Sequence, residues 1–336
     1  MTPQTSAAVR LPQLLSRAAQ GLTLSVALAT AGLIALPTAA QAAAPQQKVQ
    51  APGWYRFMVG SVEVTALSDG TVDLPVDKLL HAPKGQVAAD LKKHHLSAPL
   101  ESSINAFLIN TGTRLVLVDT GAGGLFGPTL GKLAAQLRSA GYQPEQVDDI
   151  VITHMHPDHV GGLAPEGKAA FANATVHADK ADADFWLAQA SLDAAPADQK
   201  GFIQGAMASL KPYVDAGKFS AFTADGEVVP GLRAVATHGH TPGHAVYVVE
   251  SGGQRLVLIG DLIHVGSVQL ASPDVTIGFD SDEKQARAQR LKLFKQLAQD
   301  GSLVASAHLP FPAVGRLRAV GKGYAWEPLN YSSQVK

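Results

Sequence analysis

The chain has 336 residues, of which 46% are hydrophobic and 16% are charged. This composition excludes a disordered chain, because disordered chains lack the apolar residues that build a core. Its 27 lysines and arginines balance 28 aspartates and glutamates and form no basic cluster, which argues against a nucleic-acid partner. The absence of cysteine excludes disulfides, thiolate nucleophiles and cysteine-ligated metal sites. Any metal ion must therefore bind through histidines and carboxylates.

The first 42 residues have the pattern of a secretory signal peptide. Two arginines precede an apolar stretch from Leu22 to Leu36, and Ala40-Gln41-Ala42 has the small residues after which signal peptidase cleaves. The apolar stretch is too short and too often interrupted for a stable membrane anchor. The expected organisation is a signal peptide, a flexible leader and one globular domain, over residues 1–42, 43–53 and 54–336. The location is then the periplasm or the exterior of the cell.

The first half of the domain is predicted to alternate strands with helices. Alternating or wholly apolar runs indicate strands, and apolar residues at helical spacing indicate helices. In chain order, we expect a hairpin over Tyr55–Leu67, a turn at Ser68–Gly70 and a helix over Gln86–Leu96. A second hairpin over Ile104–Val118, a helix over Leu130–Ala140 and a buried strand over Asp149–Thr153 follow.

The second half repeats this alternation after an Ala-rich helical insertion near residues 181–216, which is expected to break near Pro196 and Pro212. Three strands and a long helix, with Ser281 as its expected N-terminal cap, follow over Leu232–Ala236, Ala245–Glu250, Leu256–Ile259 and Ser281–Asp300. Strands that alternate with helices in both halves predict an α/β fold with two sheets inside and helices outside, a four-layer αββα sandwich.

The segment His154-Met155-His156-Pro157-Asp158-His159 places four metal-binding side chains within six positions at the end of a buried strand. His154 and His156 project to the same side of an extended segment, whereas Asp158 and His159 follow the turn that Pro157 imposes. This arrangement can serve two adjacent ions. A mixed set of imidazoles and carboxylates fits zinc, manganese, cobalt or iron rather than calcium.

Three further segments end apolar strands with residues of the same kind. One contains His238, His240 and His244, another ends in Asp261, and the third contains His308. Loops at strand ends can meet at one edge of a sheet and carry function on a rigid scaffold. We therefore expect these segments to converge on the first one.

In this pattern the chain resembles the metallo-β-lactamase superfamily. The resemblance rests on the His-x-His-x-Asp-His motif, the strand-end aspartate, the Thr-Pro-Gly-His turn, the Gly-Asp step and the late Ala-His step, which here contain His154, His156, Asp158, His159, Asp119, His244, Asp261 and His308. It implies the αββα fold, with one ion on His154, His156 and His244 and a second ion on Asp158, His159 and His308. It further implies that Asp261 bridges the ions, that Asp119 supports the ligands from behind, and that His238 and His240 are local hydrogen-bonding groups.

Within the superfamily, the chain resembles methyl parathion hydrolase and its N-acyl homoserine lactonase relatives. This resemblance rests on the segments 51–56, 67–70 and 125–128, together with the exported leader. It implies an apolar leaving-group pocket made by Phe126, Trp186 and Phe202. Because His264, Ile277 and Phe279 follow Asp261, we expect them at the rim of the same pocket.

The predicted activity is hydrolysis by a hydroxide held between two divalent ions, with zinc as the expected metal and Asp158 or Asp261 moving the proton. A phosphotriester needs room for three substituents around phosphorus, whereas a lactone passes through one tetrahedral carbon. Since Ile277 and Phe279 are bulky and His264 is polar, small-molecule lactones and aryl esters are the expected substrates. Organophosphate triesters are the alternative.

Two other activities of the same fold are less favoured. A β-lactamase would fit export and the histidine motif, but a bridging residue such as Asp261 is foreign to most β-lactamases of this fold. A di-iron oxidoreductase would be expected to carry a flavodoxin-like extension, for which the chain has no sequence. Whether the protein forms a homodimer is left open.

Overall fold

The structure is a computed structural model that describes residues 44–223 and 225–335. The expected signal peptide and the first residue of the leader lie outside these ranges. Residues 44–52 are exposed and contain no helix or strand. Regular structure begins at Trp54, within a compact unit that spans Gln50–Lys336. Among the helices of the described ranges, none has the length and apolar character needed to cross a bilayer.

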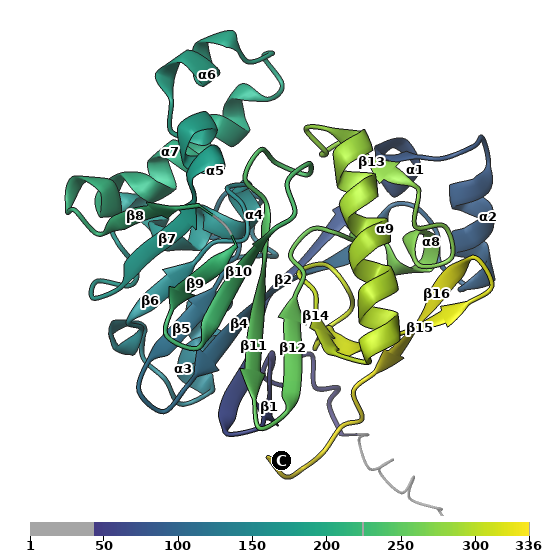
Figure 1. Cartoon of the computed structure of the whole chain (residues 1–336), viewed down its shortest axis with the longest axis horizontal. Coiled ribbons are helices and arrows are strands. Elements are labelled where there is room, and N and C mark those ends of the chain that lie inside the picture. The colour runs from purple at the N-terminus through teal and green to yellow at the C-terminus, as the bar shows by residue number, and fades with distance from the viewer. Residues whose placement is uncertain (1–43, 224, 336) are drawn as a thin grey trace, which may run out of the picture. The chain divides into compact units, whose positions relative to one another are not determined.

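Two seven-stranded sheets form the centre of this unit (Figure 1). The first sheet has the order β1-β2-β4-β5-β6-β7-β8, with β1 Trp54–Val59, β2 Val62–Leu74, β4 Leu100–Asn110, β5 Leu115–Val118, β6 Asp149–Val151, β7 Thr175–Asp179 and β8 Phe219–Phe222. Its strands pair antiparallel from β1 to β5 and parallel from β5 to β8. The parallel strands therefore direct their carboxyl ends to one edge.

The second sheet has the order β16-β15-β14-β12-β11-β10-β9, with β9 Gly226–Val229, β10 Leu232–Ala236, β11 Ala245–Ser251, β12 Gln254–Leu258, β14 Leu303–Ala305, β15 Val314–Val320 and β16 Gly323–Pro328. β12 and β14 pair in parallel, and the other neighbours pair antiparallel. A separate two-stranded sheet joins β3 (Leu80–His81) to β13 (Thr276–Ile277).

Helices cover the outer faces of both sheets, which confirms the αββα sandwich. They are α1 Val76–Leu79, α2 Gln86–Lys93, α3 Leu133–Ser139, α4 Pro157–Val160, α5 Lys180–Trp186, α6 Gln189–Ala194, α7 Lys200–Asp215, α8 Gly266–Gln269 and α9 Glu283–Asp300, with short 3-10 turns at Pro144–Gln146, Gly161–Leu163 and Pro165–Gly167. Ile109 of β4 packs in the core between the sheets, whereas its neighbour Leu108 packs with Leu137 of α3 and Leu210 of α7. Because both faces of β4 are buried, its sequence is apolar at consecutive positions.

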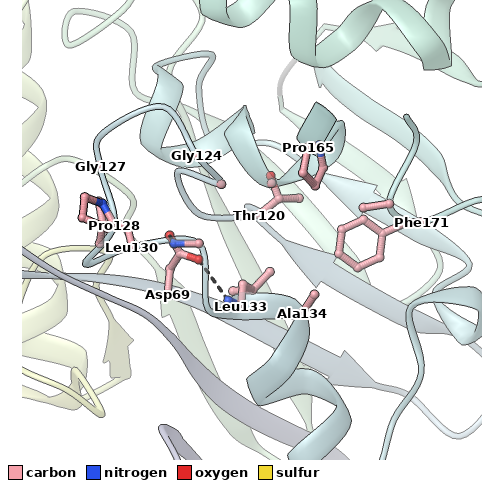
Figure 2. A pocket seen from close by; sticks show the side chains of 14 residues that line it. Asp69, Thr120, Gly124, Gly127, Pro128, Leu130, Leu133, Ala134, Pro165 and Phe171 are labelled. Atoms are coloured by element: carbon pink, nitrogen blue, oxygen red, sulfur yellow. Dashed lines mark hydrogen bonds between the residues drawn. The ribbon is translucent and has the colours of Figure 1, made fainter. Parts of the chain in front are cut away.

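The predicted turn at Ser68–Gly70 is wrong, because β2 continues through it. The pairing with β4 shifts register between Ser68 and Gly70, and Gly70 has a φ of 129°. At this bulge the carboxylate of Asp69 accepts hydrogen bonds from the backbone N–H groups of Ala122, Gly131 and Leu133. Figure 2 shows Asp69 bonded to Leu133, at the point where α3 begins. The helix therefore starts three residues later than the sequence pattern predicts.

Two predicted boundaries in the second half also differ from the structure. Pro212 lies inside α7 and does not break it. The long helix α9 is capped by Asp282, whose carboxylate accepts the backbone N–H of Gln285, and not by Ser281. A short polar side chain does cap this helix, as the capping rule requires, but it belongs to the aspartate one residue after the predicted serine.

A buried arginine on α9 holds the segment that follows β12. The guanidinium of Arg290, 1% exposed, donates to the backbone carbonyls of Leu262, Pro273 and Val275. These three bonds fix the chain on either side of α8. The loop that starts directly after β12 is therefore a rigid part of the structure.

Candidate metal centre

Seven side chains that form two candidate ligand groups converge where strands of both sheets end, and an eighth, His264, lies beside them with its Nε2 3.0 Å from Asp261 Oδ2. His154 and His156 follow β6, and Asp158 and His159 lie on the short helix α4. From the second half, His240 comes from the turn between β10 and β11, Asp261 from the loop after β12 and His308 from the loop after β14. All of them are buried except Asp158, which is half-buried.

The first group of ligand atoms comes from His154, His156, His240 and Asp261. The Oδ2 of Asp261 lies 3.6 Å from His154 Nε2 and 3.3 Å from His240 Nε2. His156 Nδ1 lies 3.1 Å from His240 Nε2. Four buried atoms from three separate segments therefore surround one point.

The second group comes from Asp158, His159 and His308. The Oδ2 of Asp158 lies 3.6 Å from the Nε2 atoms of both His159 and His308. Asp261 also reaches this group, since its Oδ1 lies 3.2 Å from His159 Nε2 and its Oδ2 lies 3.0 Å from His308 Nε2. The carboxylate of Asp261 therefore stands between the two groups.

These spacings fit divalent metal ions. Two ligand atoms bound tetrahedrally at about 2.1 Å from a zinc ion lie roughly 3.4 Å apart, and most of the distances above fall between 3.1 and 3.6 Å. Within the described part of the chain, His154 Nε2, His159 Nε2 and Asp261 Oδ1 are buried and have no hydrogen-bond partner. Buried polar atoms without partners are costly, and metal ions bound by the two groups would satisfy all three.

The charge of the cluster supports the same conclusion. Burial lowers the pKa of His154 and His156 well below the usual value, so both imidazoles are neutral, which is the form that binds metal. Burial would raise the pKa of Asp261, but the imidazoles of His159 and His308 outweigh burial and hold this pKa well below its usual range. Asp261 is therefore ionised and needs positive charge beside it.

The structure brings His240, and not His244, into the first group. The ring of His244 is engaged at both nitrogens, because Nε2 accepts the backbone N–H of Asp261 at 3.1 Å and Nδ1 lies 2.8 Å from Thr237 Oγ1. A nitrogen whose lone pair accepts a hydrogen bond is not free to bind an ion. The sequence prediction that used His244 as a ligand and set His240 aside as a hydrogen-bonding group is therefore corrected. Each histidine takes the role expected of the other.

Carboxylates orient two of these histidines from behind. Asp119, directly after β5, lies 2.8 Å from Nδ1 of His159 and also accepts both the N–H and the hydroxyl of Thr153. Asp280 lies 2.8 Å from Nδ1 of His240. Such contacts fix the ring and raise the basicity of the nitrogen that faces the metal. The sequence pattern predicted the supporting role of Asp119. It did not predict that of Asp280, which follows a short strand and belongs to no motif.

A cavity of 190 Å³ opens over the cluster, with Asp158, Asp261 and His308 in its lining. Four predicted pocket residues line it, namely Phe126, Phe202, His264 and Phe279. Its remaining walls come from apolar side chains that the sequence did not single out, Val72, Leu74 and Ile104.

A second cavity of 250 Å³ shares His156, Phe202 and Phe279 with the first, and Trp186 lines it. Ile277 lines neither cavity. It is fully buried beside Val76 and Leu80, because its strand β13 pairs with β3. The expectation that Ile277 stands at the pocket rim is therefore corrected, and its side chain does not narrow either cavity directly.

The assignment of His240 over His244 can be tested with a pair of matched variants. We expect His240→Gln to lower the bound divalent metal by about one equivalent per chain, because a tetrahedral site loses a ligand. His244→Gln should keep its metal and lose only stability, by about 1–2 kcal/mol. Elemental analysis of both purified variants beside the wild type measures the difference, and metal loss in His244→Gln alone would reverse the assignment.

Comparisons with known proteins identify the family of the chain. The profile of the metallo-beta-lactamase superfamily matches residues 100–308. An N-acyl homoserine lactonase from Bacillus sp is 26% identical over 242 residues, which cover 65% of this chain and 88% of that protein.

Two solved structures are similar over most of the chain. The crystal structure of the hydrolase AbOPH in the beta lactamase superfamily has a TM-score of 0.81 and 38% identity, and covers 85% of this chain and 100% of that one. AidC, a dizinc quorum-quenching lactonase in complex with a product, N-hexanoyl-L-homoserine, has a TM-score of 0.75 and 30% identity, with 84% and 99% covered. The chain belongs to the metallo-beta-lactamase superfamily and is a metal-dependent hydrolase.

Proposed function

We propose that this enzyme opens lactones and cleaves aryl esters at a centre of two divalent metal ions, with zinc as the preferred metal. One ion would be held by His154, His156 and His240, the second by Asp158, His159 and His308, with Asp261 shared. The observation that carries the proposal is the position of Asp261 between two ligand groups, in the floor of a small apolar cavity. The similarity to lactonases, one of them a dizinc enzyme, supports it.

The residues of the chain prepare this site for hydrolysis. When bound, two divalent ions supply a nucleophile from water at neutral pH and polarise the carbonyl of the substrate. Asp119 and Asp280 hold the rings of His159 and His240 in place, so that the ligand atoms need no rearrangement during the reaction. The rings of Phe126 and Phe202 pack edge to face, with their centroids 5.8 Å apart, and exclude water from one side of the cavity.

Asp158 is the group that fits proton transfer. Its side chain is 16% exposed and lines the cavity, whereas the side chain of Asp261 is 3% exposed and faces imidazoles. A proton on Asp261 would be opposed by the positive charge around it, as its depressed pKa indicates. Asp158 can therefore accept the proton from the attacking water at a carboxylate oxygen and pass it to the leaving alkoxide or phenolate.

The shape of the cavity favours a planar ester over a phosphotriester. The space over the metal-binding residues is only 190 Å³ and has Phe279 and His264 on one wall. The adjoining 250 Å³ offers room for one apolar substituent beside Trp186. A lactone or aryl ester places one substituent there, whereas a phosphotriester must place three groups around phosphorus. Organophosphate triesters are therefore a slower, alternative class of substrate.

A substrate panel tests this order. For the zinc-loaded protein, we expect kcat/KM for dihydrocoumarin and N-hexanoyl-homoserine lactone to exceed that for methyl paraoxon by about 100-fold or more, since the three substituents of the triester fit poorly. Nitrocefin should not be turned over. His156→Ala, which removes a ligand, should be inactive on every substrate. A dominant rate with methyl paraoxon would contradict the proposed substrate class but not the metal centre.

We also propose that the enzyme is exported, with residues 1–42 as the signal that is removed. The support is the arginine, apolar and Ala-Gln-Ala pattern of the sequence. Mass spectrometry of the mature protein from its native host should give an N-terminus at Ala43. A mature protein that retains Met1 would contradict export by this signal.

A further inference from the structure

A fully buried carboxylate outside the ligand set connects the two loops that carry the first group of ligands. Asp182 lies on α5, the first helix of the insertion, and is 0% exposed. Its Oδ2 accepts the backbone N–H of Met155 at 2.8 Å and the hydroxyl of Thr241 at 3.0 Å. Its Oδ1 accepts the backbone N–H of Gly243 at 2.6 Å. One side chain thus binds two segments that are far apart in the sequence.

Each of these three donors is adjacent or close to a ligand. Met155 lies between His154 and His156, so a fixed Met155 N–H sets the backbone from which both imidazoles project. Thr241 follows His240 directly, and Gly243 lies in the same turn. The bonds of Asp182 therefore act on the backbone of all three histidines in the first group.

The turn and the helix are in direct contact, which leaves no room for another arrangement. A Cβ atom on Gly243 would lie 2.4 Å from the backbone N of Asp182 and 2.9 Å from its Cβ. Such distances are far below normal contact, and the nearest of these atoms belongs to the backbone, which cannot turn aside. A glycine at this position lets the turn approach α5 closely enough for the Asp182 carboxylate to reach it.

We infer that Asp182 is a positioning residue for the metal centre, which holds the backbones of His154, His156 and His240 at the spacing that an ion requires. The inference rests on the proposed metal centre. It assigns a function to the start of the helical insertion, which ties the ligand loop of the first half to the ligand turn of the second. Charge-assisted bonds to backbone N–H groups are stronger than neutral ones, so a carboxylate suits this task.

The test compares two buried aspartates that accept the same number of hydrogen bonds. The donors to Asp182 lie beside metal ligands, whereas the donors to Asp69 do not. Asp182→Asn keeps the size of the side chain but turns an acceptor into an N–H₂ group that faces a donor. Asp69→Asn is the matched control, because Asp69 is also 0% exposed and likewise accepts three hydrogen bonds, here all from backbone N–H groups, none of them next to a ligand (Figure 2). Both variants should lower the Tm of the metal-free protein.

Metal affinity then separates positioning from mere stability. Zinc affinity, measured by competition with a chromogenic chelator, should fall by about 10- to 100-fold in Asp182→Asn, as for other groups that orient ligands. In Asp69→Asn it should stay within about twofold of the wild type. An Asp182→Asn affinity equal to that of Asp69→Asn would overturn the inference. If the wild type itself binds no zinc, the proposed metal centre fails instead.

A milder variant keeps the test decisive if Asp182→Asn does not fold. Thr241→Val removes one of the three hydrogen bonds and should weaken zinc binding by about tenfold, the loss expected for one hydrogen bond to a charged group. Thr241→Ser retains the hydroxyl and should restore the wild-type affinity. Equal affinities of the valine and serine variants would contradict a positioning role for the carboxylate.

Discussion

The structure depends on one buried carboxylate that requires positive charge on both sides. Asp261 is 3% exposed, and imidazole nitrogens from five different histidines lie within 3.6 Å of its two oxygens. Burying an ion in this way is costly unless the opposite charge lies beside it. The two ions that we propose would meet this need, and the remaining features of the centre follow from holding the two ligand groups at the correct separation.

The two sheets divide this task between them. The first sheet presents the histidine motif after β6 and Asp119 after β5, and the second presents His240, Asp261 and His308 at the ends of its own strands. Neither half contains a complete set of ligands for either proposed ion. The halves are held together by the shared core and by contacts at the centre itself, such as the 2.7 Å bond from Tyr247 Oη to the carbonyl of Ile152. The centre is therefore a product of sheet packing and not of one local motif.

Much of the site could be predicted from the sequence, because its ligands follow apolar strands and strand ends meet in an α/β fold. The motif around His154 and the positions of Asp261 and His308 needed no knowledge of side-chain contacts. The choice between His240 and His244 did need it. Both histidines flank the same Thr-Pro-Gly turn, and only the contacts of His244 with Thr237 and the backbone of Asp261 show which one is already engaged.

The other differences have a similar cause. Ile277 follows Asp261 in sequence, yet the pairing of β13 with β3 turns it into the core. Asp182 and Asp280 are single carboxylates without a motif, and their roles appear only when distant segments are brought together. The bulge at Asp69 likewise depends on donors from a loop some fifty residues away. Local patterns predict elements and ligand types, whereas long-range hydrogen bonds decide which side chain takes which role.

The most direct test is anomalous diffraction from crystals of the purified protein, collected on both sides of the zinc absorption edge. The account predicts two anomalous peaks, one on each side of the Asp261 carboxylate, with His154, His156 and His240 around the first and Asp158, His159 and His308 around the second. No peak in zinc-supplemented crystals, or a single ion that Asp261 does not touch, would contradict it.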